Sequence, residues 1–280
     1  MSAAANDGQQ EHEATGNREL TSILRFVPGT LASLLILLTI EFLFNLRVFG
    51  MPMLETQFYY AVVALMLPLV FLLWPAHRHA SRTSVPWYDL LLMVVAFATC
   101  GYFVYRAESI LERGWAFSAP TEAVWMSYLL WALIIEAARR AGGWPIALIA
   151  GVFSLYPLVA DIMPGPIQAF PSTLEQAAMY HTMSTESVMG IPLQAFAGLV
   201  VGFLVFGVAL QMTGGGQFFI NLAFAMLGHV RGGPAKVAIL SSGLMGSMSG
   251  SVITNVMTTG VLSIPAMRRV GMSRSFAGGV

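Results

Sequence analysis

Long apolar stretches alternate with short polar segments along most of this chain. Six stretches approach the length of about 20 apolar residues that a helix needs to cross a hydrocarbon core of about 30 Å. They occupy residues 27–45, 58–74, 88–105, 121–138, 144–163 and 191–212. The strict alternation of a membrane β-barrel strand is missing, whereas a helix satisfies its own backbone in lipid. The pattern predicts an all-α integral membrane protein with about six transmembrane helices.

Composition agrees with a membrane protein. Of the 280 residues, 56% are hydrophobic and only 10% are charged, against about 25% charged residues in soluble domains. This argues against a soluble enzyme or a soluble binding protein. The 14 basic and 14 acidic residues cancel to a formal charge of zero. The chain therefore has no net positive charge that would attract nucleic acid. The single cysteine, Cys100, lies in an apolar stretch and is interpreted as a small core residue.

The amino-terminal segment differs from everything that follows. Residues 1–26 begin with a polar and acidic sequence without periodic apolar positions, which predicts a disordered tail. Asp7, Glu11 and Glu13 precede the first apolar stretch, so the segment does not resemble a secretory signal.

Arginines predict the orientation, because cytoplasmic loops retain an excess of Lys and Arg. If the tail is cytoplasmic, the inside segments contain Arg18, Arg25, Arg78, Arg82, Arg139 and Arg140. The outside segments contain only Arg47, Arg106 and Arg113, and residues 164–190 contain no Lys or Arg. We therefore expect a cytoplasmic amino terminus.

Four carboxylates lie in or near the predicted spans, namely Glu41, Asp89, Glu136 and Asp161. An ionisable residue inside a membrane is a functional candidate by default. Each of these four nevertheless lies close to the end of a span. A carboxylate at the level of the lipid headgroups, or one paired with a nearby arginine such as Arg139 or Arg140, is the simpler interpretation.

Enzymatic chemistry is not supported by the sequence. The five histidines, His12, His77, His79, His181 and His229, all fall in predicted tail or connecting segments, so no Ser/His pair within the bilayer is expected. One cysteine and scattered histidines do not form a metal or haem motif, and no phosphate-binding glycine motif is present. We therefore predict a protein that is not an enzyme and has no cofactor.

The segment after residue 212 is less regular. The sequence TGGG at 213–216 breaks the helix, and the apolar residues 217–227 carry Gln217 and Asn221 four positions apart. Eleven residues are too few to span a bilayer. The segment is interpreted as an interfacial arm helix, with a short buried core helix as the alternative.

The following 35 residues predict a re-entrant helical hairpin over 235–267. Its two apolar limbs, 235–248 and 255–267, are each roughly 21 Å long at 1.5 Å per residue, which is too short to cross. Between them lies a small polar tip. Basic residues flank both far ends of the hairpin, so both ends are expected on the cytoplasmic side.

A polar tip at membrane depth indicates a binding site, because irregular backbone is tolerated there only where protein or a water-filled site satisfies it. Broken helices in transporters coordinate Na⁺ and anionic substrate groups with their exposed ends. The candidate ion- and substrate-binding residues are Ser249, Gly250, Ser251, Thr254, Asn255, Thr258 and Thr259. The alternative is a close helix-packing patch, since small residues also let helices approach.

Residues 186–277 resemble the membrane permease of tripartite ATP-independent periplasmic (TRAP) transporters, of the fused, TAXI-like type that joins small and large membrane subunits. The resemblance rests on GIPLQAFAGLVVGFLVFG at 190–207, RGGPAK at 231–236, SGS at 249–251 with Asn255, and IPAMRR at 264–269 followed by Gly271. Ile253 and Thr254 depart from the small apolar residues usual before the asparagine.

The resemblance implies an elevator-type secondary transporter of the bacterial inner membrane, built from inverted repeats. It would be a symporter, with Na⁺ as the coupling ion, importing small organic acids delivered by a periplasmic solute-binding protein. It also implies three parts: the cytoplasmic tail 1–26, a four-helix small-subunit-like domain 27–140, and the amino-terminal part of the large subunit 141–280, truncated at the C-terminus. A membrane anchor or assembly subunit, whose hairpin only packs against partners, is the alternative function.

Overall fold

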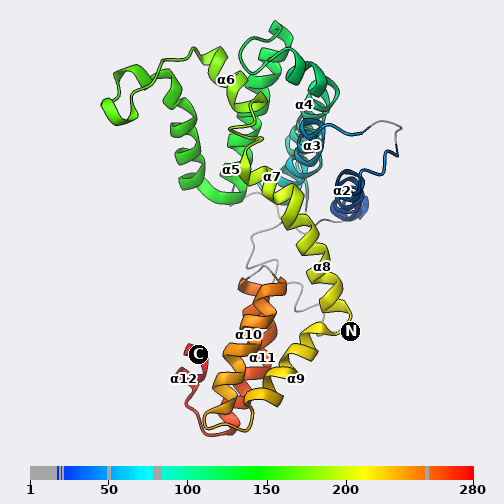
Figure 1. The fold of residues 1–280 in the computed structure, drawn as a ribbon, viewed down its shortest axis with the longest axis vertical. Helices are drawn as coiled ribbons and strands as arrows, with labels where there is room; N and C mark the ends of the chain where they lie inside the picture. Colours follow the sequence, from blue (N-terminus) through cyan, green and yellow to red (C-terminus); the bar gives the residue numbers. More distant parts are fainter. Residues whose placement is uncertain (1–17, 19, 21, 49–51, 78–83, 250–251) are drawn as a thin grey trace. The chain divides into compact units, whose positions relative to one another are not determined.

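The computed structural model describes residues 18, 20, 22–48, 52–77, 84–249 and 252–280. Within them the regular secondary structure is helical, as the hydrophobic pattern predicts. The chain divides into two compact units, Met1–Gly198 and Leu199–Val280 (Figure 1). This division falls at a different place from the boundary expected after residue 140, which stays a prediction about the two subunit-like parts.

Unit 1 contains most of the long helices. Its elements are η1 (Ser22–Phe26), α2 (Val27–Phe44), α3 (Glu55–Leu73), α4 (Trp87–Glu112), α5 (Thr121–Leu155), the short 3-10 helices η2 (Tyr156–Leu158), η3 (Ala160–Ile162) and η4 (Gly165–Ile167), α6 (Leu174–Met183) and α7 (Ile191–Ala195). A π-helical turn (Phe196–Val200) follows. Unit 2 contains α8 (Val201–Met212), α9 (Gly215–Leu227), α10 (Gly233–Ser249), α11 (Val252–Arg269) and α12 (Arg274–Gly279).

The core of unit 1 forms where α3 and α4 pack along each other and against α5 and α6. Tyr60 of α3 stacks on Phe103 of α4 with ring centroids 5.2 Å apart, and both are completely buried. The Tyr60 hydroxyl donates to the carbonyl of Thr182 at 2.8 Å, which attaches α6 to α3. Cys100 is also fully buried in this cluster, in agreement with its interpretation as a core residue.

Five helices of the described chain are long and apolar enough to cross a membrane: Leu24–Phe44, Glu55–Leu73, Trp87–Glu112, Thr121–Leu158 and Ile191–Leu210. The sequence predicted about six. The difference lies in α5, where the fourth and fifth predicted spans form a single helical run interrupted at Gly143.

The break in α5 is a sharp elbow. Gly143 has φ 82° and ψ 174°, a conformation that essentially only glycine adopts, and Pro145 follows two residues later. The second limb, residues 144–155, is roughly 18 Å long, too short to span as a helix. It turns back (Figure 1) and ends beside the start of the first limb, since Tyr156 and Phe117 line the same cavity.

Unit 2 contains the hairpin. α8 ends at Met212 and α9 begins at Gly215, with Gly214 at φ 90°, so the TGGG sequence breaks the helix as predicted. α9 packs on α10, and a Cβ added at Gly216 would lie 3.2 Å from the Met245 side chain. α9 buries Ile220 and Ala223 but exposes Phe218 by 61%. Whether α9 is an interfacial arm or a short core helix of the whole permease stays a prediction.

Candidate functional site

The predicted hairpin is present as the packed pair α10 and α11. With 17 and 18 residues, the helices are longer than the limbs expected from the sequence. α10 ends at Ser249 and α11 begins at Val252, so a C-terminal and an N-terminal helix end are separated by only two residues in the sequence. The basic residues Lys236, Arg268 and Arg269 lie at the opposite end of the pair. Its entry into a membrane from the cytoplasm stays a prediction.

The structure gathers the candidate binding residues at one end of this hairpin. Ser249 is the last residue of α10, and the later four occupy the first two turns of α11: Thr254, Asn255, Thr258 and Thr259. Gly250 and Ser251 lie outside the described residues. Among these candidates the structure describes only the side chain of Thr259, which is 6% exposed. The ligand assignments stay predictions.

The backbone at this end has a defined electrostatic character. The last carbonyls of α10 and the first N–H groups of α11 have no partner within their own helices, and these ends carry partial negative and partial positive charge. A cation is therefore favoured near the end of α10 and an anion near the start of α11. Hydroxyl- and amide-bearing residues surround the junction in the sequence, as in broken-helix ion sites.

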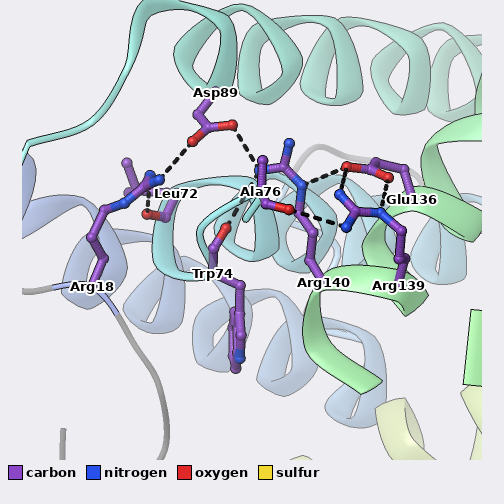
Figure 2. A network of polar contacts seen from close by, with 8 residues as sticks. All are labelled: Arg18, Leu72, Trp74, Ala76, Asp89, Glu136, Arg139 and Arg140. Carbon is purple, nitrogen blue, oxygen red and sulfur yellow. Dashed lines mark hydrogen bonds and ion pairs between the residues drawn. The ribbon is translucent and has the colours of Figure 1, made fainter. Parts of the chain in front are cut away.

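Unit 1 contains a second polar cluster, which we call the arginine clasp: Arg18, Asp89, Glu136, Arg139 and Arg140 (Figure 2). At its centre, Asp89 in the first turn of α4 is completely buried. Its Oδ2 accepts from Arg18 Nη2 and its Oδ1 from Arg140 Nη1, both at 2.7 Å. One carboxylate thus joins segments 71 and 51 positions away in the sequence.

Glu136 forms the other half of the clasp. Arg139 donates to both of its carboxylate oxygens at 2.7 Å, through Nε and Nη2. Arg140 Nε donates to Oε1 at 2.8 Å. This bidentate geometry is the strong form of an arginine–carboxylate pair. Arg140 therefore bridges Glu136 and Asp89, and all three side chains are held by hydrogen bonds within the protein.

The clasp also caps the carboxyl end of α3. Arg18 N–H donates to Leu73 O at 2.8 Å, and Arg139 Nη1 donates to Ala76 O at 3.0 Å. Cations are favoured at the negative end of a helix dipole, and the anionic Asp89 is favoured at the start of α4. The three arginines therefore compensate free carbonyls as well as two carboxylates.

This geometry bears on the interpretation of two of the four carboxylates. Asp89 and Glu136 are paired with arginines, as the simpler interpretation predicted. Glu41, 9% exposed in α2, and Asp161, exposed in η3, lie outside the clasp. Arg18 differs from expectation, since it is 1% exposed and Ser22–Phe26 is helical where a disordered tail was expected. A lone arginine in a polar segment carries no periodic signal that could have revealed this contact.

His181 also departs from the sequence interpretation, which placed it in a connecting segment without a serine partner. It lies in α6, with Nδ1 2.9 Å from Ser187 Oγ and Nε2 2.8 Å from the Ser154 carbonyl. The second ring nitrogen thus meets a backbone carbonyl, instead of the carboxylate that stabilises a catalytic imidazolium. We interpret His181 as a brace between α5, α6 and the following loop. Across the described chain, no group of three His, Cys, Asp or Glu residues could hold a metal ion.

Unit 1 consequently has two different ends. The clasp lies where α3 ends, α4 begins and α5 bends. The other end contains two segments, the connection between α4 and α5 and residues 156–172. Both segments line one cavity. α4 separates the two ends by 26 residues, roughly 39 Å of helix. These features define a multi-pass, all-α membrane protein with a helical hairpin.

The family follows from sequence comparison. The family model of the tripartite ATP-independent periplasmic transporter, DctM component, matches residues 129–280, more than half of the chain. The chain belongs to this family of TRAP transporter permeases. The match begins within α5 and includes the whole hairpin.

Curated relatives agree with this family. The sialic acid TRAP transporter permease protein SiaT of Haemophilus influenzae is 37% identical over 199 residues, covering 68% of this chain and 27% of SiaT. The C4-dicarboxylate TRAP transporter large permease protein DctM is 35% identical over 83 residues in Pseudomonas aeruginosa, which is 29% of this chain and 19% of that protein. Its Rhodobacter capsulatus counterpart is 27% identical over 130 residues, 44% and 30% of the two chains. The chain thus spans less than a third of these relatives, and no solved structure matches it.

Proposed function

We propose that this chain supplies part of the membrane permease of a secondary active TRAP transporter, which imports small organic acids with Na⁺ as the coupling ion. The observation that carries the proposal is the α10–α11 hairpin, where two opposing helix ends meet among small polar residues inside the family-matched region. Relatives named for sialic acid and C4-dicarboxylates support an organic acid substrate. A permease of this kind is not an enzyme.

At the hairpin, the two helix ends suit two charges. Na⁺ would lie near the last carbonyls of α10, with oxygens of Ser249, Ser251, Thr254, Asn255, Thr258 and Thr259 as candidate ligands. A substrate carboxylate would lie near the first N–H groups of α11, where the helix dipole favours an anion. If the site changes sides of the membrane only with both ligands bound, the downhill movement of Na⁺ drives the uphill movement of the substrate.

A periplasmic solute-binding protein is the proposed partner, and the bacterial inner membrane is the proposed location. The clasp supports the orientation, because it places Arg18, Arg139 and Arg140 at one end of unit 1. Such a concentration of arginines is typical of the cytoplasmic side. We therefore propose a cytoplasmic amino terminus.

Cysteine labelling tests this orientation. In a Cys100→Ala background, Ser172→Cys should react with an impermeant maleimide added to intact spheroplasts, whereas Ser81→Cys should react only after lysis. The reverse pattern would invert the proposed topology without affecting the hairpin assignment.

Transport itself is tested with the complete permease in proteoliposomes. Uptake of labelled sialic acid or succinate should require both an inward Na⁺ gradient and the purified solute-binding protein. Collapse of the gradient with a sodium ionophore should abolish uptake. An accessory membrane anchor would give no gradient-dependent uptake of any organic acid, and this result would replace the transporter proposal.

A further inference from the structure

At the end of unit 1 opposite the clasp lies a cavity of about 450 Å³. Phe117, before α5, and Phe170, before α6, line it together with Tyr156 and Tyr180. Two of these aromatic residues are unusually open, since Phe117 is 78% and Phe170 is 96% exposed. Large exposed aromatic side chains beside a cavity are typical of a surface that becomes covered by a partner.

The walls of this cavity are held by specific hydrogen bonds. The Tyr156 hydroxyl donates to the Ile167 carbonyl, and this hydrogen bond joins the two parts of the segment between α5 and α6. Thr173 and Gln176 form a reciprocal capping box, with N–H to side-chain distances of 3.0 and 3.2 Å, which fixes the start of α6. A preformed wall reduces the ordering cost of binding.

The segments that form the cavity are acidic. Residues 112–122 and 156–180 contain four exposed carboxylates, Glu112, Glu122, Asp161 and Glu175, against the single basic residue Arg113. Glu122 is paired with Arg106 at 3.2 Å, and the other three carboxylates surround the aromatic residues in sequence. Such a field repels an organic acid or an anionic lipid headgroup and attracts a basic protein surface.

We propose that this cavity, with its acidic surroundings, docks a soluble protein that inserts an apolar side chain between Phe117 and Phe170 from a basic surface. This inference rests on the proposed function, which places this end in the periplasm and names the solute-binding protein as the partner. The apolar contact supplies the buried anchor, and the carboxylates raise the rate of encounter and fix its orientation.

The test measures binding of the purified solute-binding protein to the complete permease in nanodiscs by biolayer interferometry. The double variant Phe117→Ser and Phe170→Ser should weaken binding at least about tenfold, mainly through faster dissociation. Glu175→Lys should slow association, and Arg113→Glu should accelerate it, both effects shrinking at high salt. Phe26→Ser, a comparably exposed phenylalanine outside the cavity, is the matched control and should bind as wild type.

The outcomes separate the two proposals. If wild type transports and binds its partner but the cavity variants bind equally well, this docking site is wrong and the proposed function stands. If the variants instead lose copurified phospholipid while partner binding is unchanged, the cavity is a lipid site and the inference is overturned. If wild-type permease shows neither binding nor uptake, the proposed function itself fails. Unchanged thermal stability of the variants verifies that the exposed positions do not affect folding.

Discussion

The arginine clasp and the α10–α11 hairpin solve the problem of polar groups in a membrane protein in opposite ways. The clasp concentrates five charged side chains, and its two carboxylates are paired with arginines that also donate to a carbonyl just beyond the end of α3. The hairpin brings small uncharged polar residues to the junction of two helices, where the last carbonyls of α10 and the first N–H groups of α11 lack partners within their own helices. Carboxylates already held by arginines are poorly placed to bind a ligand, whereas these helix ends are the ligand site that we propose.

The comparison teaches that the partners of a buried charge indicate its role better than its burial does. Asp89 is completely buried and would rank first among functional candidates by burial alone. Its two arginine partners identify it as a structural residue. We propose the neutral residues of the hairpin as the better candidates, because they lie next to two helix ends in the sequence.

The largest expected effect comes from breaking the clasp at its centre. Asp89→Leu leaves Arg18 and Arg140 buried without their carboxylate, which should destabilise the fold by about 3 to 5 kcal/mol. SDS titration of the detergent-solubilised protein measures the change. The triple variant Arg18→Met, Asp89→Leu and Arg140→Met removes all three charges and should recover most of the loss. If the triple variant were no more stable than Asp89→Leu, charge burial would not explain the effect.

A substitution in the hairpin should affect function and not stability. Loss of one neutral oxygen ligand in Asn255→Ala should cost about 1 to 3 kcal/mol of Na⁺ binding, or about 5- to 150-fold in affinity. The sodium concentration for half-maximal uptake should rise accordingly, with normal unfolding in SDS. Asn221→Ala removes an exposed amide of α9 and is the matched control. If both variants showed the same sodium dependence, Asn255 would not be a sodium ligand and would instead serve helix packing.

The elbow of α5 adjoins the clasp in the sequence, because Gly143 follows Arg139 and Arg140 within a few residues. Gly143→Ala forces a residue with a Cβ into a glycine-only conformation, which should destabilise the protein by about 1 to 3 kcal/mol. Gly101→Ala, in open space within α4, is the matched control and should be neutral or slightly stabilising. SDS titration compares the two, and equal stabilities would mean that the elbow relaxes without strain.

The smallest expected effect concerns a neutral contact in the same unit. Tyr60→Phe removes the hydrogen bond to the Thr182 carbonyl while keeping the ring stack on Phe103. The expected loss is about 1 kcal/mol, several times smaller than for Asp89→Leu. A loss as large as that of Asp89→Leu would show that this neutral hydrogen bond stabilises unit 1 as much as the buried charge pairs do.

Local features of the sequence determined most of the helical architecture. Apolar runs of membrane-spanning length, the TGGG break before α9 and the small polar segment between α10 and α11 are contiguous signals, so each can be recognised without knowing the fold. The same holds for the family, because RGGPAK, SGS and IPAMRR all lie within the matched residues 129–280. The five candidate binding positions that the structure describes gather at one hairpin end because they are neighbours in the chain.

Tertiary structure alone decided the contacts between distant segments. Asp89 contacts Arg18 and Arg140, and His181 contacts Ser187 and the Ser154 carbonyl. Residues 144–155 turn back, so that Tyr156 lines a cavity together with Phe117. No periodicity connects these residues, because their partners are selected by which helix ends pack together and which free carbonyls need a donor. Hydrophobic periodicity is set by one helix and its surroundings, whereas an ion pair between helices depends on the positions of all of them.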